Sequence, residues 1–116
     1  MVTKSNWNSL PGVEIWHGAV VRQVFSGKNS MMVMNRITPA ARPALHSHPH
    51  EQLSYILEGK CKFVLGDEIF DLVEGDVILI PPDVPHSLEV TGDKNVLNLD
   101  VFSPIREDYL PANPGR

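Results

Sequence analysis

Residues 52–80 read QLSYILEGKCKFVLGDEIFDLVEGDVILI, and this stretch carries the clearest indication of the fold. Apolar and polar residues alternate over 52–57 and again over 60–65, as in strands with one buried and one wetter face. In the first run, leucine and tyrosine alternate with Gln52 and Ser54. Each run ends where glycine adjoins an acidic residue, a combination typical of turns. We therefore expect short antiparallel strands joined by tight turns.

Similar runs rich in Val, Ile, Leu and Phe continue on both sides, bounded by Gly, Pro, Asn or Asp. The predicted strands are residues 13–17, 19–25, 30–38, 52–57, 60–65, 68–73, 76–80, 86–91 and 95–102. So many short strands predict an all-β sandwich or small barrel. A helical turn is predicted only near the C-terminus, with Ser103 as N-cap and Pro104 at its first position. Pro111 and Pro114 would end it.

Composition restricts the class of protein. The 116 residues suit a single domain, 1–116. A net charge of −4 argues against nucleic acid as a partner. No run approaches the ~18 apolar residues of a membrane span, and residues 1–12 lack the apolar segment of a signal peptide. Cys61 is the single cysteine and can form no internal disulfide. Together, these three features lead us to expect a cytoplasmic protein without a membrane partner.

Three of the five histidines lie in the pentapeptide HSHPH at 46–50. On an extended segment, His46 and His48 point the same way and can aim two imidazoles at one metal ion. A third ligand is expected from the residues that follow, His50, Glu51 or Gln52. His86 is the candidate for a fourth ligand, because the proline-rich turn PPDVPH would place it reproducibly. The alternative is that the paired histidines are ordinary polar surface.

Two motifs resemble those of the cupins. HSHPHEQLSYILEG, residues 46–59, resembles the first cupin motif, and GDVILIPPDVPH, residues 75–86, resembles the second. This resemblance implies a double-stranded β-helix of the jelly-roll type. It also implies one divalent transition metal ion, with Ni, Zn, Mn and Fe as candidates, held at the barrel mouth. Its implied ligands are His46, His48, Gln52 and His86.

The sequence departs from the cupin pattern at two positions. Gln52 stands where the third ligand is commonly Glu, and the neighbouring Glu51 should face away because one step along a strand reverses direction. A neutral amide leaves the ion its full charge, which favours an anionic substrate. Asp83 stands where glycine is frequent, and aspartate tolerates the left-handed turn. We interpret His50 as a rim or solvated residue, and His17 as structural or exposed.

The last predicted strand carries Asn98, Asp100 and Phe102 on one face. Pattern alone favours solvent exposure for this face, whereas inside a jelly roll it would line the barrel. There Asp100 could act as a general acid or base and Phe102 could form a pocket wall. Arg106 could clamp a substrate carboxylate. The alternative for Arg106 is a salt bridge with a nearby acid such as Glu107 or Asp108.

The C-terminal segment LDVFSPIREDYL, residues 99–110, together with HSHPHEQ, is similar to the KdgF family of pectin degradation. These proteins convert 4,5-unsaturated uronate monosaccharides from pectin or alginate to open-chain 5-keto-4-deoxyuronate. The resemblance implies an isomerase-type enzyme with an anionic sugar as substrate. It also implies active-site roles for Asp100, Phe102 and Arg106.

Two other functions compatible with the sequence are a metal-dependent dioxygenase or other small-molecule cupin enzyme, and a non-catalytic sugar-binding cupin. A carboxylate is usual at non-haem iron, so Gln52 argues mildly against the dioxygenase. We also expect a homodimer, because residues 13–25 with Met31, Met32 and Met34 offer apolar surface for a partner. Alternatively, these methionines fill the core of the monomer.

Overall fold

The computed structural model describes residues 2–42 and 44–110, which form nine strands and one 3₁₀ turn. The strands are β1 (Val13–Ile15), β2 (Val20–Ser26), β3 (Met31–Ile37), β4 (Glu51–Glu58), β5 (Cys61–Leu65), β6 (Glu68–Leu72), β7 (Val77–Ile80), β8 (His86–Val90) and β9 (Val96–Ser103). All nine predicted strands are present, with ends shifted by two residues or fewer. In the described ranges no helix is long and apolar enough to cross a membrane.

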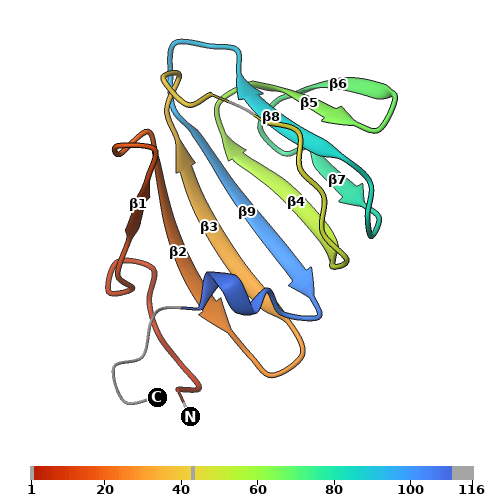
Figure 1. Cartoon of the computed structure of the whole chain (residues 1–116). Helices are drawn as coiled ribbons and strands as arrows, with labels where there is room; N and C mark the ends of the chain where they lie inside the picture. Colours follow the sequence, from red (N-terminus) through yellow and green to blue (C-terminus); the bar gives the residue numbers. More distant parts are fainter. Residues whose placement is uncertain (1, 43, 111–116) are drawn as a thin grey trace.

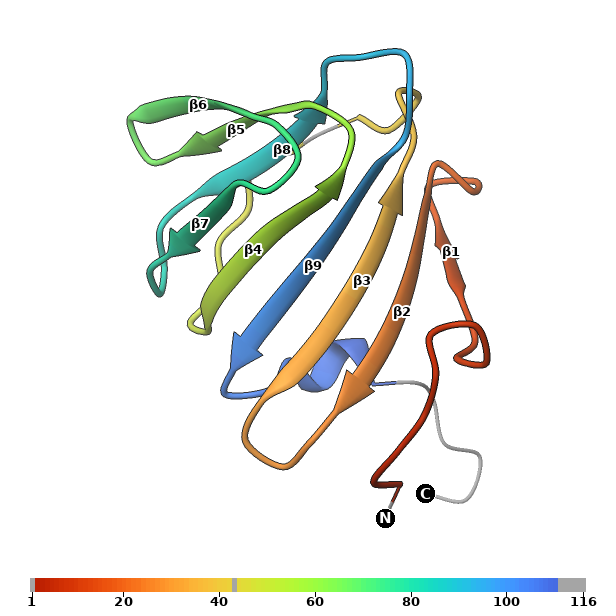
Figure 2. The same cartoon turned by 180° about the vertical axis from the view of Figure 1, so that it is seen from behind.

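The strands form two antiparallel sheets. One has six strands in the order β1-β2-β3-β9-β4-β7, and the other has three in the order β6-β5-β8. In Figure 1 the smaller sheet lies beside the β4 and β7 end of the larger one. Figure 2 shows the same arrangement from behind. Residues far apart in the sequence therefore share one interior, since β9 pairs with both β3 and β4.

Two apolar clusters fill this interior. The larger one, between the sheets, consists of Ile56, Cys61, Phe63, Leu72, Ile80 and Val96. The smaller consists of Met31, Val33 and Phe102, with Tyr109 and Leu110 packed against it. Met31 therefore fills the core, whereas Met32 is exposed. The core role is thus confirmed for Met31, while the partner surface considered for Met32 stays a prediction.

The alternation of apolar and polar residues on β4 was predicted correctly. In the first half of the strand, however, the polar residues are the ones that face the interior. Gln52 and Ser54 are buried, while Leu53 and Tyr55 on the opposite face are 50% and 41% exposed. Cross-strand neighbours on β7 extend this outward apolar face, because Leu53 pairs with Leu79 and Tyr55 with Val77. The polar side faces inward because it lines a pocket, described below.

The C-terminal turn differs from its prediction. A 3₁₀ turn covers Glu107–Tyr109 and is preceded by Arg106 in an extended conformation without a side-chain cap. Ser103 is the last residue of β9, and its hydroxyl donates to the Asn29 carbonyl at 3.3 Å, so it caps no helix. Pro111 and Pro114, predicted to end the turn, lie outside the described residues. The turn crosses the inner face of the larger sheet (Figures 1 and 2).

Candidate metal site and adjoining pocket

Three histidines from two distant segments meet at one end of the interior. Each of His46, His48 and His86 offers a ligand atom, and these atoms lie within 4.8 Å of one another. Backbone hydrogen bonds between His46 and His86, at 3.1 and 2.9 Å, join the two segments directly. The proline-rich turn is held by Asp83, which has φ +67° and donates its N–H to the His48 carbonyl at 2.8 Å. Asp83 thus adopts the left-handed conformation predicted for it.

The backbone sets the tautomer of all three rings. Each Nδ1 lies within hydrogen-bond distance of a carbonyl two residues away, and because a carbonyl can only accept, each Nδ1 carries the proton. The acceptors are Ala44, His50 and Val84, at 3.1, 3.1 and 2.9 Å. Neutral rings of this tautomer keep a lone pair at Nε2, as a metal ligand requires. Nε2 of His86 is buried with no hydrogen-bond partner among the described residues.

Burial keeps two of these rings neutral. Burial lowers the pKa of His86 to about 4, and its ring stacks parallel to Phe63 with the centroids 6.1 Å apart. Burial, with the nearby Arg106 charge, also lowers the pKa of His48 below its ordinary value. Rings that resist protonation are available to a cation at neutral pH.

Gln52 completes the donor set from β4. Its Oε1 lies 3.0 Å from Nε2 of His48. Both atoms carry lone pairs, so they repel unless a cation lies between them or the amide turns. Two ligands at right angles on an ion with bonds of about 2.1 Å lie about 3 Å apart. Glu51, one residue earlier, is exposed, as predicted. The donor set therefore fits a divalent ion bound by three imidazoles and one amide oxygen.

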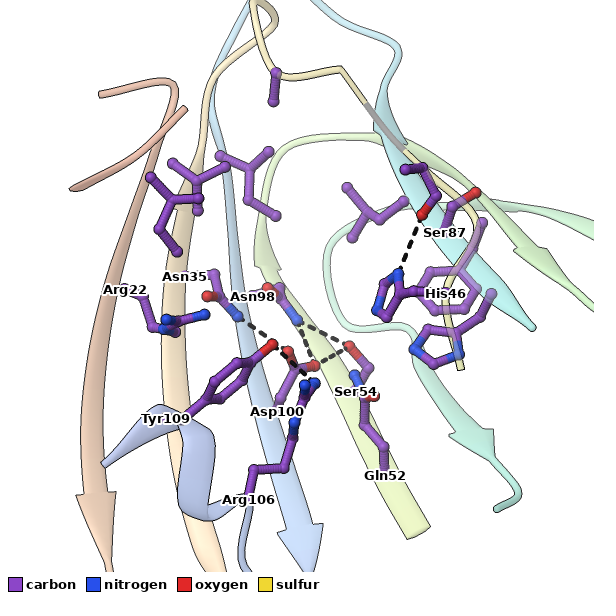
Figure 3. A pocket seen from close by; sticks show the side chains of 18 of the residues that line it. Arg22, Asn35, His46, Gln52, Ser54, Ser87, Asn98, Asp100, Arg106 and Tyr109 are labelled. Atoms are coloured by element: carbon purple, nitrogen blue, oxygen red, sulfur yellow. Dashed lines mark hydrogen bonds between the residues drawn. The ribbon is translucent and has the colours of Figure 1, made fainter. Parts of the chain in front are cut away.

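The site opens into a pocket of about 410 Å³ whose floor is polar. Asp100 on β9 accepts hydrogen bonds from Ser54 at 2.6 Å, Asn98 at 2.7 Å and Asn35 at 2.9 Å (Figure 3). Burial raises the pKa of Asp100 above its ordinary value, and hydrogen bonds, Gln52 among the donors, offset part of the rise. The polar face of β9 is thus interior.

Aromatic and cationic side chains also line the pocket. Phe102 is 1% exposed, and its ring meets that of His48 edge-on at 5.5 Å. Arg106 donates to both carboxylate oxygens of Asp108, at 3.3 and 2.9 Å, and to the Tyr109 hydroxyl at 2.8 Å. The Asp108 salt bridge considered for Arg106 is therefore present, although Arg106 still lines the pocket.

The other two histidines lie outside the cluster. His50 is half-buried, with its ring 5.4 Å from that of His48, and its Nδ1 has no partner among the described residues. His17 is exposed, in the turn between β1 and β2 with φ +57°. Neither belongs to the group of three whose ligand atoms converge.

The pocket residues not identified from the sequence include Arg22, Asn35, Ser54 and Tyr109. Ser54 follows Gln52 by two on β4, so the period of two would have found it. Arg22 and Asn35 are cross-strand partners on β2 and β3, which only the register reveals. Tyr109 lies on the 3₁₀ turn, and no signal in the sequence directs it inward. Apolar lining residues, among them Ile15, Val20, Ile37 and Leu88, were also not predicted.

Comparison with known proteins assigns the family. The family model described as "Cupin domain" matches residues 33–102, and the chain belongs to this family. An RmlC-like cupin from Shewanella frigidimarina superposes with a TM-score of 0.85 at 28% identity, covering 95% of this chain and 97% of the other. The predicted all-β jelly-roll fold and the cupin resemblance are thereby confirmed.

KdgF from Halomonas sp. has a TM-score of 0.81 at 22% identity, covering 90% of this chain and 97% of the other, a likeness of fold alone. An uncharacterised protein of Methanocaldococcus jannaschii is 26% identical over 98 residues, 79% of this chain and 78% of that protein. Oxalate decarboxylase OxdC of Bacillus subtilis is 31% identical over 74 residues, 60% of this chain but 19% of its own length. The relatives of this chain thus include cupin enzymes.

Proposed function

We propose that this cupin is a metal-dependent enzyme that opens the ring of 4,5-unsaturated uronate monosaccharides to give linear 5-keto-4-deoxyuronate. The observation that carries the proposal is the placement of Asp100 in the same pocket as the histidine cluster and two arginines, Arg22 and Arg106. A proton carrier, a candidate Lewis-acid site and cations for an anionic substrate are the three requirements of this reaction. The likeness in fold to KdgF is consistent with it.

The reaction needs one proton to be moved. A base takes the proton of the C1 hydroxyl, the C1 carbonyl forms as the bond from C1 to the ring oxygen breaks, and an enolate remains at C5. Protonation of C4 then yields the C5 ketone, so substrate and product are isomers. A divalent ion held by His46, His48, Gln52 and His86 would stabilise the developing negative charge on substrate oxygen and orient the sugar.

Asp100 is the proposed proton carrier. Its raised pKa makes it a better base than an ordinary carboxylate, and the same group can return the proton to C4. The donors Ser54, Asn98 and Asn35 fix its orientation, so the carboxylate is held in place before substrate binds. Phe102 closes the wall beside it and excludes water.

The test is to mix the purified, metal-loaded protein with unsaturated galacturonate and follow the ultraviolet absorbance of the conjugated alkene. Loss of absorbance faster than in the protein-free reaction, abolished by Asp100→Ala in a folded variant, is the expected result. Equal rates with and without protein would exclude this activity. Binding of uronates without turnover would favour a sugar-binding role instead.

A second candidate is another metal-dependent reaction, with oxygen activation as the case to test. It is favoured by the apolar part of the pocket lining, which includes Ile15, Val20, Ile37 and Leu88 and which a hydroxyl-rich sugar does not complement. An organic acid with an apolar body would match both the apolar and the polar residues that line the pocket. Oxygen consumption by iron-loaded protein across a panel of such acids would identify this activity.

A further inference from the structure

Arg22 points into the pocket from β2. Its partner across the strands is Asn35, the residue that donates to Asp100, so both lie on the inner face of the larger sheet. The guanidinium carbon of Arg22 lies 3.7 Å from the centroid of the Tyr109 ring, at the distance of a cation–π contact. Figure 3 shows Arg22 and His46 on opposite sides of the pocket, with Asp100 and Ser54 between them. The aromatic ring holds Arg22 in place without using its N–H donors.

The two arginines of the pocket differ in their partners. Arg106 also lies over the Tyr109 ring, at 4.0 Å, but it forms a two-pronged salt bridge with Asp108. Within residues 2–42 and 44–110, the side chain of Arg22 forms neither an ion pair nor a hydrogen bond, while its backbone pairs with β1 and β3. Asp100 forms no ion pair with Arg22 among the described residues, and its carboxylate accepts hydrogen bonds from Ser54, Asn98 and Asn35. The N–H donors of Arg22 are thus available to a ligand.

A half-buried guanidinium with free donors and a second cation nearby is a site for an anion. The planar fork of arginine matches a carboxylate with two parallel hydrogen bonds. The second cation is already paired with Asp108, so an added carboxylate would gain most from Arg22. The aromatic contact reduces the loss of side-chain freedom on binding, because the guanidinium is positioned in advance.

We propose that Arg22 binds the carboxylate of the substrate and so selects acids over neutral sugars. This inference rests on the proposed function, for which it sets the orientation of the substrate. The carboxylate, carried on C5, would meet Arg22, while the hydroxyls at C1 and C2 on the other side of the ring would face the histidine cluster. The C1 and C4 positions, which exchange the proton, would then pass over Asp100.

The test compares an acid with its neutral counterpart. Metal-loaded wild type, Arg22→Gln and Arg22→Lys are assayed with unsaturated galacturonate and with its methyl ester. Arg36→Gln is the matched control, because Arg36 is exposed on the outer face of β3. For Arg22→Gln we expect kcat/KM for the acid to fall roughly 10- to 100-fold, with kcat/KM for the ester little changed. Arg22→Lys should recover part of the loss.

The proposal would be overturned if Arg22→Gln lowered kcat/KM equally for the acid and the ester. It would also be overturned if the variant, with wild-type circular dichroism, kept the preference for the acid. Calorimetric binding to the metal-loaded protein tests the anion site at Arg22 independently of the uronate activity. The probes are saturated galacturonate, adipate and benzoate, each against its methyl ester. If wild type turns over no uronate yet binds one of these acids through Arg22, the activity fails and the anion site stands. If wild type binds none of them, the anion site is wrong.

Discussion

Protonation of His86 should destabilise the metal-free protein. Its pKa is lowered to about 4, against an ordinary value of 6.5, because the ring is 2% exposed and lies against His46, with the two centroids 4.3 Å apart. Between these two pH values the unfolded chain binds a proton that the folded chain does not. The free energy of unfolding therefore falls as the pH falls from 6.5 to 4, and it is unaffected by this group above 6.5.

The magnitude follows from the shift. A difference of about 2.5 pH units at 1.36 kcal/mol each is about 3 kcal/mol, the full loss being reached below pH 4. That is a large part of the stability of a small domain. The lowered pKa of His48 acts in the same direction, so acidification should loosen the whole cluster.

The assay is urea denaturation of chelator-treated protein at several pH values between 4 and 7.5, for wild type and His86→Gln. The variant lacks the titrating ring. Between pH 7.5 and pH 4, its free energy of unfolding should therefore fall by about 3 kcal/mol less than that of the wild type. His17→Gln, at an exposed position, should follow the wild type. The reasoning is refuted if His86→Gln and wild type lose stability in parallel between pH 6.5 and 4.

Four further predictions concern the site and the fold. Asp100→Asn should lower kcat for the uronate by roughly 10²- to 10⁴-fold while circular dichroism stays unchanged, and full activity would remove this residue from the mechanism. Gln52→Glu should tighten binding of a divalent ion, measured by competition with a chelator, because a carboxylate is the stronger ligand; weaker binding would argue that the amide is not at the metal. Gly59→Ala should cost about 2 to 3 kcal/mol in urea unfolding, since φ is +90° and the new Cβ would lie 2.6 Å from a backbone oxygen, whereas Gly75→Ala, at φ +92° with open space, should cost less. The predicted homodimer should appear in light scattering and be weakened by Met32→Lys, because this apolar side chain is 37% exposed on the strands expected to meet the partner; an unchanged dimer mass for this variant would refute that surface.

Local patterns determined the strands and the common direction of His46 and His48. The period of two and the glycine turns are properties of neighbouring residues, so the strand positions could be predicted within two residues. His46 and His48 lie one residue apart on an extended segment, and their common direction follows from that geometry alone. The proline-rich turn before His86 is likewise local. Their convergence was inferred through the cupin resemblance, and the backbone hydrogen bonds between His46 and His86 agree with it.

Only the tertiary structure decided which side of each strand is the interior. Alternation is the same whichever face is buried, and a polar face such as that of Asn98 and Asp100 suggests solvent when taken alone. Pairing of β9 between β3 and β4 turns this face inward, where Asn35 and Ser54 supply the hydrogen bonds that a buried carboxylate requires. The placement of Arg22 likewise depends on contacts between segments far apart in sequence, which no local pattern encodes.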